Sequence, residues 1–534
     1  MNKNSKTIEN NSPFFEFNSV TTYIFTACLA LTYFVFSLFS DGFYQHDEVA
    51  NFLGAQTIWY DDLINIVGAN SKAGYKLLYS VPALGGFTFL KLFNSIVAAL
   101  TVFFSYKLLK KIGSKNSVLI FLLLGVQPLW FMLSFRNYAE LTVSFLLVAS
   151  LLLLYNKKFI LSALIISFAA FTRQEYHLVL ICFFIAFLMK KQYLAAILTG
   201  TFTFLQNLIG FIITGDILFL PHTVMEFSEK IKGVWPKQGF DHYFIMSNVI
   251  FGSAVLTLFI AYIALMILNK KKPNWMLVSI AFIIFLLNCA FNSQSFSFGP
   301  GNGGNLRYLM TIAPIVGIIS VLALDEVSLL KKRYLLLLFL TPLIVLVGMY
   351  QTYEHLNYGI RLSDQRFWLP LIFMLLVTIL LIIPIKLKQR TIGIAIVSIL
   401  IALTQISTRR IQPEEETIQK AAKWYKRHTK PGKNQIFTNE NRIVCNHVLF
   451  YYYLDKNKNQ FEKEPIMRLT KEVTDSLQKG DIVIWESHYG YRPKLRPTSQ
   501  PYDFYDKNES YQKIQYYQSK DKRFMIVFFQ KIKD

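Results

Sequence analysis

The sequence "VTTYIFTACLALTYFVFSLF", residues 20–39, is an apolar run long enough to cross a lipid bilayer as one helix. It is longer than the core of a signal peptide and lacks a clear small-residue cleavage site, so we interpret it as a retained first span. Similar apolar blocks recur along the 534-residue chain, which is 53% hydrophobic and only 16% charged. The chain is therefore predicted to be an α-helical polytopic membrane protein.

The apolar blocks predict about 13 transmembrane helices within a membrane domain that covers residues 20–408. The predicted spans are 20–39, 83–111, 117–135, 137–155, 158–172, 175–190, 193–214, 246–269, 275–292, 307–325, 333–350, 367–386 and 390–408. Two of them, 158–172 and 175–190, are short. They are interpreted as tilted or re-entrant pieces.

The loops on one side of these spans are rich in lysine and arginine, as at 107–115, 270–272 and 386–390. Because cytoplasmic loops are enriched in these residues, the N-terminal segment 1–19 is predicted to be cytoplasmic. An odd number of spans then places residues 409–534 in the periplasm or an equivalent lumen. These turns also explain the net charge of +22. No nucleic-acid partner is predicted, because the basic residues do not gather on one soluble face.

Residues 409–534 have the mixed pattern of a small C-terminal α/β extracytoplasmic domain. A helix is predicted near 412–428, followed by the strand-like sequences "NQIFT", "DIVIWES" and "RFMIVFFQ". The expected location of the whole protein is the cell (inner) membrane, with several passes through it.

Polar residues gather in the predicted outside loops, the first of which is 40–82. There "FYQHDEVANF" holds His46, Asp47 and Glu48 in a row. A carboxylate at the membrane boundary is partly desolvated and can act as a general base toward a hydroxyl group. The alternative is that these acids only cap helices or stay solvated, and one Asp-Glu pair does not decide between the two.

Two further segments place charged residues at the same predicted face of the membrane. "SFRNYAE" holds Arg136 and Glu140, and "FTRQEY" holds Arg173 and Glu175. Charged residues at this depth are costly, so they are usually paired or functional. A structural ion pair within each segment is the alternative interpretation.

The sequence "FGPGNGGNLRYLMTIAP", residues 298–314, runs from a Gly-rich outside loop into a span. Arg307 and Tyr308 lie at the boundary. Gly-rich backbone and an arginine suit a phosphate group, but no Gly-Lys-Ser/Thr sequence follows the glycines, which argues against ATP. A hinge loop with an arginine that reaches the membrane interface is the alternative.

The remaining histidines show no metal-binding spacing such as His-Glu-x-x-His, and no Asp-x-Asp triplet occurs in the chain. The sequence therefore predicts no metal site. The four cysteines have no redox or metal-ligand spacing.

Together these motifs resemble the GT-C superfamily of polytopic glycosyltransferases. Its members include protein O-mannosyltransferases, mannosyltransferases of lipid-linked glycans and GPI anchors, and bacterial aminoarabinose transferases. "HDEVANF" resembles the acidic motif in the first outside loop of the mannosyltransferases, and "SFRNYAE" resembles a segment after the third span in the lipid-glycan branch. "TRQE" is similar to a Thr-Arg-x-Glu stretch of bacterial members, and "LRYLMTIAP" to their Arg-Tyr-Leu span start. The chain departs from family forms in which a residue separates the histidine from the Asp-Glu pair.

The resemblance implies transfer of a sugar, such as a mannose-like hexose, from a polyprenyl-phosphate carrier to an acceptor hydroxyl on the outer face, with inversion. The catalytic residues that it implies are Asp47, as general base, and Glu48. The substrate-binding residues that it implies are His46, Arg136, Glu140, Arg173, Glu175, Arg307 and Tyr308. The expected partners are the bilayer, the lipid-linked donor and a glycan, glycolipid or protein acceptor. No further cofactor is implied, and the sequence leaves open whether a divalent ion assists Glu48.

Two other functions fit a polytopic protein with charged residues near the membrane. A flippase or transporter of lipid-linked sugars would carry its charges at mid-membrane, whereas here they lie at span ends on one side. An oligosaccharide polymerase or ligase usually relies on a large outside loop between late spans, whereas here the acidic loop follows the first span.

Overall fold

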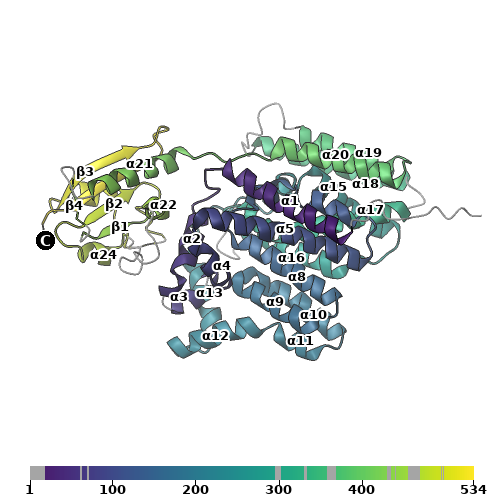
Figure 1. Cartoon of the computed structure of the whole chain (residues 1–534), viewed down its shortest axis with the longest axis horizontal. Helices are drawn as coiled ribbons and strands as arrows, with labels where there is room; N and C mark the ends of the chain where they lie inside the picture. Colours follow the sequence, from purple (N-terminus) through teal and green to yellow (C-terminus); the bar gives the residue numbers. More distant parts are fainter. Residues whose placement is uncertain are drawn as a thin grey trace, which may run out of the picture.

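The computed structural model describes most of the chain, in ranges separated by short gaps. These ranges are 18–60, 63–68, 71–294, 302–329, 334–357, 368–429, 435–438, 441–454, 469–494, 496 and 498–533. A large bundle of helices is followed by a small domain built around a β-sheet, which lies at one end of the bundle (Figure 1). Residues 1–17 of the predicted cytoplasmic segment lie outside the described ranges.

Among the described residues, six helices are long and apolar enough to cross a membrane, or eight if each of two bent helix pairs counts as one span. The six are α1 Ser19–Leu38, α5 Gly86–Ile112, α16 Trp275–Asn292, η4 Leu306–Ile312 continued by α17 Ala313–Leu329, α18 Tyr334–Asn357 and α20 Leu387–Gln405. The bent pairs are α12 Thr201–Thr214 with α13 Phe219–Lys230, and α14 His242–Phe251 with α15 Ser253–Leu268. Shorter apolar helices are α8 Ala139–Tyr155, α9 Phe159–Thr172, η3 Gln174–Tyr176 continued by α10 His177–Met189, and α19 Leu369–Ile382. The predicted α-helical membrane architecture is confirmed, and the described part of the chain contains fewer full-length apolar helices than the thirteen predicted segments.

The predicted span 117–135 is broken. It consists of η2 Ser117–Leu119, α6 Ile120–Leu123 and α7 Pro128–Leu133. Pro128 has no backbone N–H, and its ring would clash with the carbonyl of Leu124 in a continuous helix. The interruption is buried, and the Tyr33 hydroxyl donates a hydrogen bond of 2.7 Å to the Gly125 carbonyl there. Hydropathy alone missed this break because both halves of the segment are apolar.

Short helices occupy the predicted first outside loop and the connection before α12. They are α2 Asp47–Thr57, η1 Ile58–Tyr60, α3 Leu63–Val67, α4 Ala73–Leu84 and α11 Tyr193–Leu198. The loop helices α2, α3 and α4 lie at the end of the bundle that faces the sheet domain (Figure 1).

Among its described residues, the C-terminal domain combines four helices with one mixed sheet. The helices are α21 Pro413–His428, α22 Val448–Tyr453, α24 Lys471–Asp475 and α25 Tyr502–Asp506. The strands are β1 Ile443–Cys445, β2 Ile482–Glu486, β3 Tyr511–Gln518 and β4 Met525–Lys531. In the order β1-β2-β4-β3, β1 is parallel to β2, and the β2–β4 and β4–β3 pairs are antiparallel. The predicted small α/β domain is thus present.

The helix and two of the three strands expected in this domain are found, as α21, β2 and β4. The strand expected at "NQIFT" is wrong. The amides of Ile436 and Phe437 donate to the His428 carbonyl at the end of α21, so the described residues 435–438 cap the helix and form no strand. Phe437 is fully buried against Tyr425 of α21, which explains its apolar pattern.

One hydrophobic core joins the sheet domain to the first loop. Val49 and Phe52 of α2 pack in the same buried cluster as Leu449 of α22 and Ile484 of β2. The backbone reinforces this junction, because the Gly42 amide donates to the Arg409 carbonyl at 2.9 Å. The start of α2 is therefore held from two sides, by the helical bundle and by the C-terminal domain.

Candidate active site

A cavity of about 2090 Å³ lies where the bundle, the first loop and the sheet domain meet. The ionisable residues that line it include His46, Asp47, Lys72, Arg173, Glu175 and Arg307. Its apolar lining includes Ile181, Phe184, Phe204, Leu220, Val224 and Met225, from α10, α12 and α13. A cavity that combines charged groups with an apolar wall can hold an amphiphilic molecule.

Asp47 is the first residue of α2, a position where the helix dipole favours a carboxylate. Its side chain is 54% exposed and lines the cavity. Arg307 Nη2 donates to Asp47 Oδ2 at 2.6 Å. Burial by itself raises the pKa of Asp47, but the positive charges of Arg307 and Lys72 outweigh it and lower that pKa to about 2. Asp47 is therefore an anion at neutral pH.

Arg173 and Arg307 share one buried carboxylate, that of Glu140 in the first turn of α8. Arg173 Nη1 lies 2.6 Å from Glu140 Oε1, and Arg307 Nε lies 3.1 Å from the same oxygen. Arg173 Nε also donates to Glu175 Oε1 at 2.6 Å, so the ion pair that was the alternative interpretation of this segment is present. A row of alternating charges thus runs from Asp47 through Arg307, Glu140 and Arg173 to Glu175. All of these residues line the cavity except Glu140, which is fully buried.

Tyr308 contacts both arginines through its ring. The guanidinium carbons of Arg173 and Arg307 lie 5.2 and 5.6 Å from the ring centre, and that of Arg307 lies 4.6 Å from the centre of the Tyr138 ring. These cation–π contacts help to fix the guanidinium groups. Arg307 Nη1 is buried and has no hydrogen-bond partner in the part of the chain that the structure describes. A charged donor left open in this way can bind an anion.

Glu48 and Arg136 form a separate buried ion pair. Arg136 Nη1 donates to Glu48 Oε2 at 2.8 Å and to the Gly42 carbonyl at 3.0 Å. Neither side chain is among the residues that line the cavity. The alternative interpretation of an ion pair between Arg136 and Glu140 does not hold, because Arg136 pairs with Glu48 and Glu140 pairs with Arg173 and Arg307. Arg136 instead holds the turn that precedes α2.

Lys72 is a cavity residue that the sequence analysis missed. It lies just before α4 in a left-handed conformation (φ 53°), and its Nζ donates to Asn51 Oδ1 of α2 at 3.1 Å. Burial lowers the pKa of Lys72, and the nearby Asp47 charge opposes that effect. The backbone of α4 approaches Thr172 so closely that a Cβ on Gly74 would lie 2.3 Å from the Thr172 hydroxyl. This close approach brings Lys72 near the end of α9, and nothing in the local sequence indicates it.

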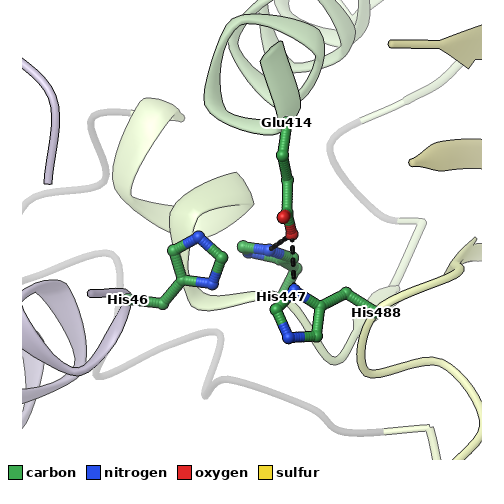
Figure 2. A group of neighbouring side chains, drawn as sticks. All are labelled: His46, Glu414, His447 and His488. Atoms are coloured by element: carbon green, nitrogen blue, oxygen red, sulfur yellow. Dashed lines mark hydrogen bonds and ion pairs between the residues drawn. The ribbon is translucent and has the colours of Figure 1, made fainter. Parts of the chain in front are cut away.

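His46 faces the sheet domain (Figure 2). Its Nδ1 and the Tyr489 hydroxyl are hydrogen-bonded at 3.0 Å, and its ring centre lies 4.7 Å from that of His447 and 5.3 Å from that of His488. Burial is the main cause, and the nearby His447 the second, of a pKa of His46 lowered to about 3. The His46 ring is therefore neutral at neutral pH. The three adjacent residues of the His-Asp-Glu motif therefore have different partners. His46 contacts the sheet domain, Asp47 pairs with Arg307, and Glu48 pairs with Arg136.

No protein-family model matches the sequence, and no curated protein matches it either. The structure, however, is similar to two solved structures of ArnT from Cupriavidus metallidurans, one in the apo state and one bound to undecaprenyl phosphate. Both align with a TM-score of 0.55 over 96% of this chain and 98% of the ArnT chain, at 11% and 12% sequence identity. The chain has the GT-C fold. Because the alignment covers nearly the whole chain, the GT-C architecture extends over the bundle and the sheet domain.

Proposed function

We propose that this GT-C protein is a membrane glycosyltransferase that moves one sugar from a polyprenyl-phosphate carrier to an acceptor hydroxyl. The observation that carries the proposal is the single cavity in which Asp47 and the cations Arg307, Arg173 and Lys72 lie beside a long apolar wall. A water-soluble substrate does not need the long apolar wall. A lipid with a phosphate headgroup would contact the apolar wall with its chain and the charged residues with its phosphate.

The donor is proposed to lie with its isoprenoid chain against α10, α12 and α13 and its phosphate near Arg307. Arg307 Nη1 is buried and has no hydrogen-bond partner in the described residues, and Lys72 and Arg173 supply further positive charge. Charge-assisted hydrogen bonds of this kind recognise phosphate well. ArnT from Cupriavidus metallidurans, which shares the fold, has been solved with undecaprenyl phosphate bound.

In the proposed reaction the acceptor oxygen attacks the sugar C1 from the face opposite the phosphate. The new C1–O bond forms as the bond from C1 to the phosphate oxygen breaks, so the anomeric configuration inverts. Asp47 takes the proton from the acceptor hydroxyl, and Arg307 stabilises the charge that develops on the leaving phosphate. Polyprenyl phosphate is a good leaving group at neutral pH. No general acid and no metal ion are required for this step.

The remaining site residues are proposed to position these groups. Glu140 holds the two arginines in place, and Tyr308 packs against both of them. Glu48 and Arg136 are assigned to the turn before α2, since they form a buried pair with each other and do not line the cavity.

We further propose that the cavity opens on the non-cytoplasmic side of the cell (inner) membrane, with the N-terminus cytoplasmic and the C-terminal domain periplasmic. A lipid carrier is the natural donor there because nucleotide sugars are absent outside the cytoplasm. His488 and Tyr489 of the C-terminal domain also line the cavity. The acceptor is therefore proposed to approach Asp47 from the side of the cavity that this domain forms. A hexose such as mannose is the proposed sugar, and a glycan, glycolipid or protein the proposed acceptor.

The test is turnover in membranes that contain the full chain and are supplied with a set of polyprenyl-phosphate-linked sugars. Mass spectrometry measures the polyprenyl phosphate that is released and the sugar that is transferred. Asp47→Asn should lower the rate by at least about a hundred- to a thousand-fold, the usual cost of removing a group that acts in the transition state. The matched control is Asp503→Asn, which changes an exposed aspartate of α25. Near-normal turnover in the Asp47 variant would exclude Asp47 as the base.

A further inference from the structure

Three histidines and one glutamate meet at the junction between α2 and the sheet domain (Figure 2). His46 immediately precedes α2, Glu414 lies in the first turn of α21, His447 caps α22, and His488 follows β2. Each residue offers one nitrogen or oxygen, and these four atoms all lie within 4.8 Å of one another. The first residue comes from the helical bundle and the other three from the C-terminal domain.

The four side chains point toward a common centre (Figure 2). Glu414 Oε1 accepts hydrogen bonds from His447 Nε2 at 3.0 Å and from His488 Nδ1 at 2.7 Å. The His46 ring lies against both of the other histidine rings. One carboxylate with three imidazoles is an unusual set to gather for stability alone, because the His447 ring is fully buried and the His46 and His488 rings are partly removed from water.

The surroundings hold these side chains in position. His46 Nδ1 is hydrogen-bonded to the Tyr489 hydroxyl at 3.0 Å, which leaves the opposite nitrogen of that ring to face other groups. Glu486, which is fully buried, accepts the amides of His488 and Tyr489 at 2.7 and 2.8 Å and so fixes the loop after β2. Hydrogen bonds to the second ring nitrogen and to the supporting backbone are typical of histidines that bind metals.

We propose that His46, Glu414, His447 and His488 bind one divalent transition-metal ion, with Zn²⁺ as the best match. Three imidazoles and a carboxylate suit Zn²⁺, whereas Mg²⁺ and Ca²⁺ prefer oxygen ligands. Four protein ligands make a closed tetrahedral site of the structural kind. The ion would fasten the C-terminal domain to the residue next to Asp47.

Metal binding requires a small rearrangement of the cluster. Zn–N bonds of about 2.0–2.1 Å bring neighbouring ligand atoms to roughly 3.3 Å from one another, so the group must contract from its present spread of up to 4.8 Å. Binding through His447 Nε2 also moves the ring proton to Nδ1, which now accepts a long hydrogen bond of 3.3 Å from the Leu449 amide. That contact would open when the ion binds.

The proposal concerns metal binding and does not depend on the proposed transfer reaction. The full chain, purified in nanodiscs without a histidine tag, is stripped with EDTA and titrated with Zn²⁺ against a chelator of known affinity. Elemental analysis should find one Zn²⁺ per chain, and the metal should raise the thermal unfolding temperature. Millimolar Mg²⁺ should not displace it. Binding weaker than about 10 μM, or equal displacement by Mg²⁺, would overturn the proposal.

Two variants test the ligands, and a third is the control. Glu414→Gln keeps an oxygen that accepts hydrogen bonds, and His488→Asn changes a loop residue, so both should fold and should bind Zn²⁺ at least a hundred-fold more weakly. His222→Gln alters a histidine that is 52% exposed and lies outside the cluster, and it should bind like the unmodified chain. If the Glu414 and His488 variants keep full affinity, the four residues are not the ligands.

Discussion

Glu140→Gln is the most specific test of the row of alternating charges at the site, because it should change both the stability of the chain and its affinity for a lipid phosphate. Glu140 is fully buried and contacts both Arg173 and Arg307. At an effective dielectric constant of about 20, two charges 4 Å apart attract by roughly 4 kcal/mol, so the carboxylate offsets much of the repulsion between the two arginines. Breaking a buried ion pair usually costs about 3–5 kcal/mol of folding free energy. We expect a loss near the lower end, because Asp47 and Glu175 still pair with the arginines.

The same substitution should strengthen binding of a lipid phosphate. With Glu140 neutral, the arginines have one anion fewer to satisfy them, and a phosphate in the cavity can take its place. A hydrogen bond to a charged group contributes about 1.5–3 kcal/mol, which corresponds to about a ten- to hundred-fold lower Kd for undecaprenyl phosphate. Turnover should nevertheless fall, because the arginines lose their fixed position and the product phosphate leaves more slowly.

The assay combines chemical denaturation of the purified chain with titration of undecaprenyl phosphate in nanodiscs. Glu48→Gln is the matched control, since Glu48 is also a fully buried glutamate, but the arginine with which it pairs, Arg136, does not line the cavity. Both variants should be less stable. Only Glu140→Gln should bind the lipid phosphate more tightly. An unchanged or weaker affinity in Glu140→Gln would refute the assignment of these arginines to the phosphate.

Two other substitutions test the junction that carries α2. Gly42→Ala should lower the free energy of unfolding by about 1–3 kcal/mol, because the added Cβ would lie 2.1 Å from the Arg410 carbonyl oxygen. It should also expose the linker before α21 to limited proteolysis. Gly200→Ala is the neutral control, since the nearest atom to its Cβ would be 3.6 Å away. Arg136→Met should cost about 3–5 kcal/mol in denaturation experiments because it leaves Glu48 charged and buried, and adding Glu48→Gln should recover much of that loss. If the double variant is no more stable than Arg136→Met alone, the ion pair is not the cause.

The membrane architecture could be predicted because hydropathy is a local property. Each predicted apolar block corresponds to one or more helices among the described residues. The break at Pro128 and the stretch at "NQIFT" were not predicted. The segment around Pro128 is apolar because it is buried, whereas only Phe437 is buried among residues 435–438. In both places contacts outside the segment decide its conformation, such as that of Tyr33 with the Gly125 carbonyl and those of the Ile436 and Phe437 amides with the His428 carbonyl.

The residue types of the candidate site were also predictable, because ionisable groups at span ends are costly and stand out. His46, Asp47, Arg173, Glu175, Arg307 and Tyr308 all line the cavity. Their partners were not predictable from spacing. Arg136 pairs with Glu48 of a different segment, and Lys72 reaches the site only because α4 packs against the end of α9.

The cluster of His46, Glu414, His447 and His488 could not be predicted from the sequence either. Its members are isolated in the sequence and come from four different elements, so no motif spacing connects them. Only the docking of the C-terminal domain on α2 brings them together. A search for metal sites by local spacing therefore finds nothing in this chain.

The most direct measurement is a structure of the full chain in nanodiscs with a non-hydrolysable polyprenyl phosphonate analogue of the sugar donor. The phosphonate should lie within hydrogen-bond distance of Arg307 Nη1, the sugar C1 should face Asp47, and the isoprenoid chain should follow α10, α12 and α13. The proposed function would be contradicted if the headgroup bound elsewhere and Arg307 still paired only with Asp47 and Glu140.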